Sequence, residues 1–287
     1  MFDAQVSVLQ PWAFGGLAPL TSRWVLGGVA ALSALTQPEK SAAREHASAE
    51  LPYTSQSVGE PGTLEQRVFI YNAIGTVVSP WHDIPLYLKG GLLSFVCEIP
   101  AETRKKVEVA TDEALTPIKQ DVKEGKPRYY PYNIHWNYGM LPQTWEDPTH
   151  SSAAVGGLFG DNDPVDVVEI GSAQLMTGSV YAVKPLAVLA MIDDGELDWK
   201  VIAIRVDDPL AAGLEDVEDV ERELPGLIER IRVWFRDYKT PDGKPQSRFA
   251  FDGKPQNKDF ALQVIAETHG FYNALKASKV GGRLSLV

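Results

Sequence analysis

The chain has 287 residues, of which 44% are hydrophobic and 23% are charged, so it is large enough for one or two compact units and too apolar for global disorder. It carries 27 basic and 38 acidic residues, a formal net charge of −11, which argues against a general nucleic-acid scaffold. Cys97 is the single cysteine, which excludes an intrachain disulfide and a CxxC zinc site and fits a reducing compartment.

The first 50 residues are expected to form a poorly ordered extension ahead of a folded domain over residues 51–287. The apolar run 24–35 (WVLGGVAALSAL) is shorter than the roughly 20 residues that a membrane-spanning helix needs. Residues 1–38 carry only Asp3 and Arg23 as charges, without the basic start of a secretory leader or the several arginines of a transit peptide. We therefore expect a cytoplasmic protein with no membrane span, with organelle targeting through residues 1–50 as the alternative.

Short β-like runs separated by Gly, Asp, Asn or Pro fill the middle of the chain. The predicted strands are residues 68–71, 93–99, 106–109, 164–170, 178–191 and 199–206. Two helical stripes follow, the first over Leu224–Tyr238 with Pro225 in its first turn and the second over Phe260–Leu275. Strands followed by helices predict an α+β fold, a small closed β-barrel (OB-like, with a five-stranded core) with peripheral strands and C-terminal helices packed outside.

Three aspartates, Asp161, Asp163 and Asp166, lie within six positions beside a predicted strand. Like charges this close repel one another, and in a folded site they are best tolerated with cations between them. An EF-hand is excluded, because its fifth and sixth loop places would hold Val165 and Asp166 instead of an oxygen ligand and glycine. A solvated turn remains the alternative for this segment alone.

A second acidic segment, residues 193–200, lies between two predicted strands and contains Asp193, Asp194, Glu196 and Asp198. Alone it indicates a hydrated loop. If the strands bring both loops to one mouth of a barrel, the carboxylates exceed what one Mg²⁺ needs, which favours a multi-metal site for phosphates. Candidate phosphate partners are Lys106 (two residues before Glu108), Arg128, Lys200, Tyr238 and Lys239.

Several motifs in consistent order resemble the soluble family I inorganic pyrophosphatases, particularly their eukaryotic branch. Residues 161–166 (DNDPVD) look like the aspartate signature of that family. The other similar segments are 82–86 (HDIPL), 96–100 (VCEIP), 137–139 (NYG) leading into 142–148 (PQTWEDP), 198–203 (DWKVIA) and 234–239 (WFRDYK). The resemblance covers roughly residues 52–277.

Position by position, the resemblance implies two sets of residues. The metal ligands would be Asp161, Asp163, Asp166, Asp193 and Asp198, with Glu98 and Glu108 binding directly or through water and Glu196 behind them. The groups on phosphate would be Lys106, Arg128, Lys200, Tyr238 and Lys239, with Tyr138 nearby. Asp163 would hold and deprotonate the attacking water.

The reaction implied is hydrolysis of pyrophosphate, a phosphoric anhydride, to two orthophosphates by a water or hydroxide that bridges metals. It would need several Mg²⁺ per site, with Mn²⁺ or Zn²⁺ able to substitute and Ca²⁺ inhibitory. A homodimer is also implied, but Ala101 and Glu102 stand where relatives usually have a basic residue and an aromatic, which puts the usual interface in doubt. The rival hypotheses are a noncatalytic oligonucleotide-binding barrel and a calcium buffer on an inactive scaffold.

Overall fold

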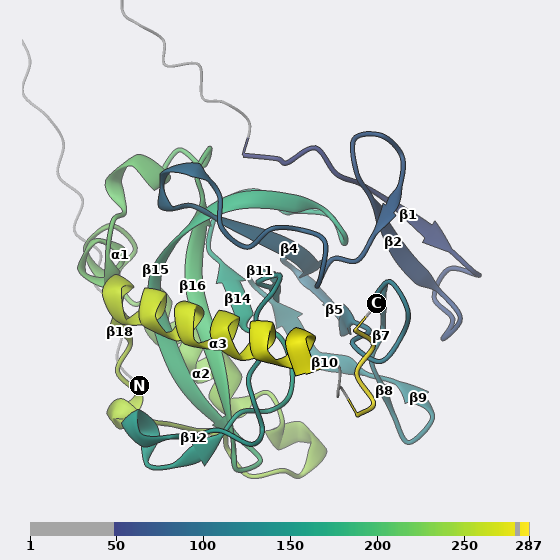
Figure 1. Cartoon of the computed structure of the whole chain (residues 1–287). Helices are drawn as coiled ribbons and strands as arrows, with labels where there is room; N and C mark the ends of the chain where they lie inside the picture. Colours follow the sequence, from purple (N-terminus) through teal and green to yellow (C-terminus); the bar gives the residue numbers. More distant parts are fainter. Residues whose placement is uncertain (1–48, 279–281, 287) are drawn as a thin grey trace, which may run out of the picture. The chain divides into compact units, whose positions relative to one another are not determined.

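The computed structural model describes residues 49–278 and 282–286 (Figure 1). The predictions of a poorly ordered extension and of a targeting segment fall almost wholly outside these ranges, as does the apolar run 24–35. The described body begins with Ala49, which is buried, and Glu50, which bridges to Tyr181. Among the residues placed by the structure, we find no helix with the length and apolarity needed to cross a membrane.

A seven-stranded sheet forms the centre of the fold (Figure 1). Its strands are β4 (Leu93–Ile99), β11 (Asn137–Met140), β14 (Asp166–Glu169), β15 (Val180–Asp193), β16 (Glu196–Arg205), β17 (Arg248–Phe249) and β18 (Gln256–Asn257). Hydrogen-bonded neighbours run β16, β14, β11, β4 and β15, and β15 pairs again with β16. All these pairings are antiparallel except that of β14 with β16. Each of these five strands therefore has two partners within the set.

A second sheet of five strands and three two-stranded ribbons surround this centre. The second sheet contains β1 (Thr54–Val58), β2 (Arg67–Tyr71), β3 (Val77–Val78), β6 (Val107–Val109) and β7 (Ile118–Gln120). The ribbons pair β5 (Thr103–Lys105) with β10 (Tyr129–Ile134), β8 (Val122–Lys123) with β9 (Lys126–Pro127), and β12 (Ser151–Ser152) with β13 (Leu158–Phe159). The peripheral strands are thus numerous and short.

Three α-helices lie in the C-terminal part: α1 (Val217–Glu223), α2 (Leu227–Asp237) and α3 (Lys258–Ser278). Short 3₁₀ turns occur at Lys89–Gly91, Ala153–Val155, Ala211–Gly213, Thr240–Asp242 and Phe251–Gly253. The prediction of one helix with Pro225 in its first turn was wrong at its start. Gly226, with φ +73°, is the N-cap of α2, and Pro225 lies in the link after α1. The left-handed conformation of Gly226 separates the two helices.

The two faces of the central strands fill two apolar clusters. Val96, Val168 and Ile202 belong to one cluster, whereas their chain neighbours Phe95, Val167 and Val201 belong to the other. This alternation is the two-residue period of a strand buried on both faces, which explains why these strands read as continuous apolar runs. Helix α2 packs into the first cluster, whereas α3 contributes to both: its first half packs into the second cluster, and Tyr272 and Leu275 near its end belong to the first.

Candidate active site

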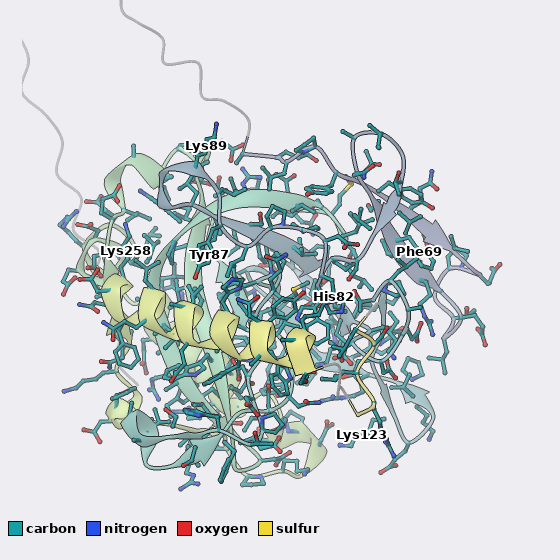
Figure 2. All side chains as sticks on the ribbon, in the orientation of Figure 1. Phe69, His82, Tyr87, Lys89, Lys123 and Lys258 are labelled. Atoms are coloured by element: carbon teal, nitrogen blue, oxygen red, sulfur yellow. The ribbon has the colours of Figure 1, made fainter. Side chains whose placement is uncertain are left out.

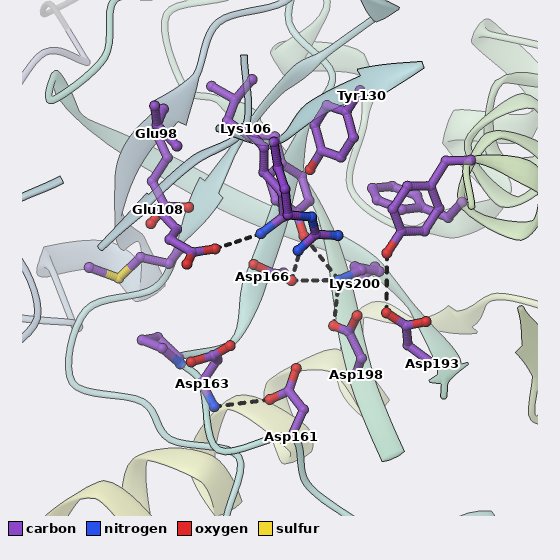
Figure 3. Close-up of a pocket in the computed structure, with 18 of the residues that line it drawn as sticks. Glu98, Lys106, Glu108, Tyr130, Asp161, Asp163, Asp166, Asp193, Asp198 and Lys200 are labelled. Carbon is purple, nitrogen blue, oxygen red and sulfur yellow. Dashed lines mark hydrogen bonds and ion pairs between the residues drawn. The ribbon is translucent and has the colours of Figure 1, made fainter. Parts of the chain in front are cut away.

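A cavity of about 260 Å³ opens among the central strands, β6 and the start of the segment after α2 (Figure 3). Nine carboxylates and four basic side chains line it, and we call it the acidic cavity. Every site residue predicted from the sequence lies on its wall: Glu98, Lys106, Glu108, Arg128, Tyr138, Asp161, Asp163, Asp166, Asp193, Glu196, Asp198, Lys200, Tyr238 and Lys239. The fold therefore brings together residues that are up to 141 positions apart in the sequence.

Strand register explains much of this convergence. Asp166 on β14 is the direct neighbour of Lys200 on β16, and Asp198 points to the same face as Lys200 because side chains alternate along a strand. The β15–β16 hairpin turns at Asp194 and Gly195, which both have positive φ, and this turn places Asp193 across from Glu196. The two acidic segments thus meet at one end of the sheet.

Lys200 is buried at the centre of the carboxylates. Its Nζ donates to Tyr138 Oη at 2.9 Å and to carboxylate oxygens of Asp166 and Asp198. Burial alone would lower the pKa of Lys200, but Asp166 and Asp198 outweigh it and hold the pKa well above its ordinary value. Tyr138 Oη donates in turn to Asp166. Lys200 therefore stays charged and fixes the positions of both aspartates.

Lys106 and Arg128 form a second cationic group of the acidic cavity, joined through Asp121. Lys106 Nζ lies 2.5 Å from Glu108 Oε2 and 2.7 Å from Asp121 Oδ2, and Arg128 Nη1 lies 2.6 Å from the same Asp121 oxygen. Burial would raise the pKa of Asp121, but the two cations outweigh it and lower the pKa. Asp121 was missed by the sequence analysis, because it stands alone and far from both acidic segments.

Tyr238 and Lys239 enter from the segment after α2. Lys239 Nζ lies 2.5 and 2.6 Å from the two oxygens of Asp193, and Tyr238 Oη donates to Asp193 at 3.1 Å. These contacts hold the β15–β16 turn against the end of α2. Within the described residues, the cations of the acidic cavity are thus all paired with its own carboxylates or with Asp121.

Glu146, Asp161 and Asp198 each place one carboxylate oxygen within 4.8 Å of the others, an arrangement that could hold a metal ion. Glu146 is only 3% exposed; its Oε1 accepts from the Trp199 amide at 3.0 Å, and its Oε2 is buried with no hydrogen-bond partner among the described residues. Glu146 lies within the motif 142–148, but no role was predicted for it from the sequence.

Burial is the main cause of strong pKa shifts in this group. It raises the pKa of Asp161 and Glu146 well above the ordinary values, and repulsion from neighbouring carboxylates adds to the shift. Desolvation within the acidic cavity, with repulsion from Glu108, also raises the pKa of Asp163 to about 7, and burial with repulsion from Asp166 raises that of Asp198 to about 7. Carboxylates that resist ionisation in this way fit a site completed by divalent cations.

Residues 161–163 have the local geometry of the turn that was the alternative interpretation of this segment. Asp161 Oδ1 accepts from the amide of Asp163 at 3.0 Å, and Asn162 has a φ of +76°. Both aspartates nevertheless line the acidic cavity. The turn geometry and the acidic cluster are therefore compatible, since the turn is what presents the two carboxylates.

The family model, the sequence relatives and the solved structures that this chain matches are inorganic pyrophosphatases. The inorganic pyrophosphatase family model matches residues 95–273. Over 232 residues, 80% of this chain, it is 59% identical to soluble inorganic pyrophosphatase 6, chloroplastic, of Arabidopsis thaliana (77% of that protein) and 61% identical to soluble inorganic pyrophosphatase 1, chloroplastic, of Chlamydomonas reinhardtii (82%). Among solved structures, the type I inorganic pyrophosphatase of Toxoplasma gondii has a TM-score of 0.75 at 44% identity, covering 78% of this chain and 99% of that one.

Proposed function

The chain belongs to the inorganic pyrophosphatase family and is a hydrolase of pyrophosphate, and we propose that the acidic cavity is where it cleaves pyrophosphate to two orthophosphates with Mg²⁺. The observation that carries this assignment is the meeting of nine carboxylates and four cations in one cavity, with a buried and unpaired oxygen of Glu146 behind Asp161 and Asp198. Metal-binding acids and phosphate-binding bases are both needed for phosphoryl transfer to water.

The donor set fits hard divalent ions. Asp161, Asp198 and Glu146 offer only oxygen atoms, which Mg²⁺ prefers, and Asp163, Asp166 and Asp193 extend the set. Bound divalent ions would supply positive charge to the phosphate oxygens and lower the pKa of a water molecule. The remaining predicted carboxylates, Glu98, Glu108 and Glu196, would hold waters around the ions. The Glu98 side chain is oriented for this role by the Val109 amide, which donates to its Oε1 at 2.7 Å.

In this proposal, the protein side chains orient the substrate and handle the proton. Asp163, whose pKa lies near neutrality, accepts the proton of the attacking water. Lys106, Arg128 and Lys239 exchange carboxylate contacts for phosphate oxygens, and the Tyr238 hydroxyl donates to the leaving phosphate. Lys200 holds Asp166 and Asp198 in place throughout. The cationic side chains thereby stabilise the charge that develops on the leaving group.

The first experiment measures orthophosphate release from pyrophosphate under five conditions: Mg²⁺, Mn²⁺ or Zn²⁺ in its place, Ca²⁺ alone, Mg²⁺ with Ca²⁺ added, and EDTA. We expect full turnover with Mg²⁺, partial turnover with Mn²⁺ or Zn²⁺, and loss of turnover with EDTA. Addition of Ca²⁺ to the Mg²⁺ enzyme should inhibit, because Ca²⁺ prefers longer oxygen distances and irregular coordination. Turnover in EDTA would contradict a metal-dependent mechanism, and tight Ca²⁺ binding without any turnover would favour the calcium-buffer hypothesis.

We further propose that the five strands β4, β11, β14, β15 and β16 form the closed OB-like barrel, since their pairings return from β15 to β16. Residues 51–287 would then be the pyrophosphatase domain. The homodimer stays a prediction; its interface would have to accommodate Glu102, whose Oε1 lies 2.9 Å from His135 Nδ1 in the same chain. Light scattering coupled to gel filtration distinguishes monomer from dimer.

Organelle targeting is favoured over the cytoplasm by the two relatives that are named chloroplastic. We propose a plastid location that depends on residues 1–50. Fusion of residues 1–50 to a fluorescent protein should direct it to the organelle, whereas the protein lacking them should stay in the cytoplasm. A cytoplasmic fusion would support the original expectation instead.

A further inference from the structure

A second cavity, of about 220 Å³, adjoins the acidic cavity on the side of the β8–β9 ribbon. Five basic side chains and two carboxylates line it, so we call it the basic cavity. Its cations are Lys106, Lys123, Lys126, Arg128 and Lys239. Lys106, Arg128 and Lys239 already have carboxylate partners, so the uncompensated positive charge of the basic cavity comes from Lys123 and Lys126. In a protein with a net charge of −11, this local positive charge indicates an anionic ligand.

The ribbon presents two lysines side by side. Lys123 on β8 and Lys126 on β9 are direct cross-strand partners, joined through the two-residue turn Glu124–Gly125, in which both residues have positive φ. Both lysines are exposed, and no carboxylate forms an ion pair with either of them within the described residues (Figure 2 labels Lys123 at the edge of the molecule). Like charges directly opposite one another destabilise a ribbon, and an anion between them would remove that repulsion.

The basic cavity shares a wall with the acidic cavity. Lys106, Arg128 and Lys239 line both. Among the described residues, Asp121 accepts the side-chain hydrogen bond that is seen from the Arg128 guanidinium, and it contacts Nη1 alone, so the other N–H groups remain available. The exposed Tyr129 hydroxyl adds a donor at the rim. A chain of phosphoryl groups could therefore run from one cavity into the other over these three cations.

We propose that the basic cavity is a subsite for the third phosphoryl group of inorganic triphosphate and longer linear polyphosphates. The inference rests on the proposed function, because the acidic cavity must hold the two phosphoryl groups at the other end of the chain. The different charges of the two cavities support this proposal. A phosphoryl group among the carboxylates of the acidic cavity needs metal ions to balance its charge, whereas a phosphoryl group beside Lys123 and Lys126 is neutralised by the protein alone. A single pyrophosphate that fills the acidic cavity leaves these two lysines unused.

The test compares three proteins: the wild type, Lys123→Ala/Lys126→Ala, and the charge-matched control Lys89→Ala/Lys254→Ala. Lys89 and Lys254 are exposed, and neither lines a cavity with the site residues (Figure 2 labels Lys89 far from Lys123). At fixed free Mg²⁺ and low ionic strength, one measures the KM for pyrophosphate and the competitive inhibition constant of inorganic triphosphate. Titration calorimetry of triphosphate on the same proteins gives a second readout that does not need turnover.

We expect the Lys123→Ala/Lys126→Ala protein to bind triphosphate about tenfold more weakly than the wild type in both measurements. This is roughly the effect of losing two solvent-screened contacts. The KM of pyrophosphate should change less than threefold, the control should change neither constant more than twofold, and 0.5 M salt should shrink the difference. An unchanged inhibition constant for triphosphate in the Lys123→Ala/Lys126→Ala protein would overturn the proposal. An equal loss of affinity for pyrophosphate would also overturn it, because the two lysines would then only attract anions in general. A wild type without pyrophosphate turnover would contradict the proposed function, whereas calorimetry would still test the subsite.

Discussion

Asp161 and Asp163 are two positions apart, yet they face different partners in the acidic cavity. Asp161 lies with Glu146 and Asp198, where three carboxylate oxygens approach one another. After desolvation, the strongest influences on the pKa of Asp163 come from Glu108, which raises it, and Lys106, which lowers it. The turn that separates the two side chains would therefore allow the two roles proposed above, with Asp161 as a metal ligand and Asp163 placed toward the cations proposed to bind phosphate.

This division predicts different Mg²⁺ responses for two matched substitutions. Asp161→Asn should lose metal affinity, so that part of its activity returns as Mg²⁺ is raised, because site occupancy follows the free metal concentration. Asp163→Asn should stay at least about 100-fold below the wild type at any Mg²⁺ concentration, because an amide cannot accept a proton. The measurement is turnover against Mg²⁺ concentration, with circular dichroism to check folding. Recovery of Asp163→Asn to nearly wild-type turnover would make Asp163 an ordinary ligand.

Glu146 gives a prediction that does not depend on activity. Glu146→Gln keeps the acceptor for the Trp199 amide and replaces the buried, unpaired Oε2 with an NH₂ group. We expect the metal-free protein to be at least as stable as the wild type, since a carboxylate that burial and repulsion disfavour is removed. Mg²⁺ should bind about tenfold more weakly. Calorimetry and melting curves measure both effects, with the exposed Glu221→Gln as control; unchanged Mg²⁺ affinity would exclude Glu146 from the metal site.

Charge density along the chain indicated most of the carboxylates that line the acidic cavity, but not every residue of the candidate site. The two acidic segments were conspicuous, and the family resemblance supplied Glu98 and Tyr138, which are isolated in the sequence. Asp121 and Glu146 were missed because each is a single carboxylate whose importance arises from packing. Asp121 acts by contacting Lys106 and Arg128, and the Glu146 side chain matters because it is buried beside Asp161 and Asp198. Neither contact has a signal in the local sequence.

At the scale of elements, the apolar strands were predicted well and the polar ones were missed. Residues 93–99 match β4, because an uninterrupted apolar run suits a strand buried on both faces. Strand β10 contains Pro131, and β11 has Gly139 in its interior, two residues that speak against a strand in sequence analysis. The structure explains Gly139: a Cβ there would lie 2.0 Å from the Val96 carbonyl oxygen of β4. The close approach of β4 and β11, two strands that are far apart in the sequence, therefore requires glycine at position 139.

The loop before Asp161 depends on a similar close approach. A Cβ on Gly160 would lie 2.4 Å from the Glu146 carbonyl carbon and 2.5 Å from its oxygen. Gly160→Ala should therefore push the loop away from Glu146, lower the melting temperature and weaken Mg²⁺ binding by tenfold or more. Gly213→Ala is the control, because nothing lies within 4 Å of the added carbon. Melting curves with and without Mg²⁺ test this, and an unchanged Mg²⁺ response would show that the loop position does not set metal affinity.

At the scale of the whole molecule, the acidic cavity makes stability depend on pH and on metal ions together. In the metal-free protein, burial and neighbouring charges raise the pKa of Asp163 and Asp198 from 3.8 to about 7. The folded state therefore holds these protons more tightly than the unfolded chain does. Their contribution to stability is fully present below about pH 3.8 and is lost as the pH rises through about 7. Asp163 and Asp198 thus favour a protonated or metal-bound fold over an empty, ionised one.

Mg²⁺ should consequently stabilise the protein more at pH 8 than at pH 5.5. At pH 5.5 the ions must displace protons from Asp163 and Asp198, which lowers the apparent affinity, whereas at pH 8 the carboxylates are already ionised. Mg²⁺ at about 100 times its dissociation constant contributes about 2.7 kcal/mol, which corresponds to a rise in Tm of roughly 5–10 °C for a domain of this size. We expect that rise at pH 8 and less than half of it at pH 5.5, measured by scanning fluorimetry at constant ionic strength. Asp198→Asn should flatten the difference between the two pH values, because it removes one of the two titrating groups. Equal shifts at both pH values in the wild type would mean that Mg²⁺ binds without displacing protons, and the convergence of the two acidic segments would then not be what controls the stability of the fold.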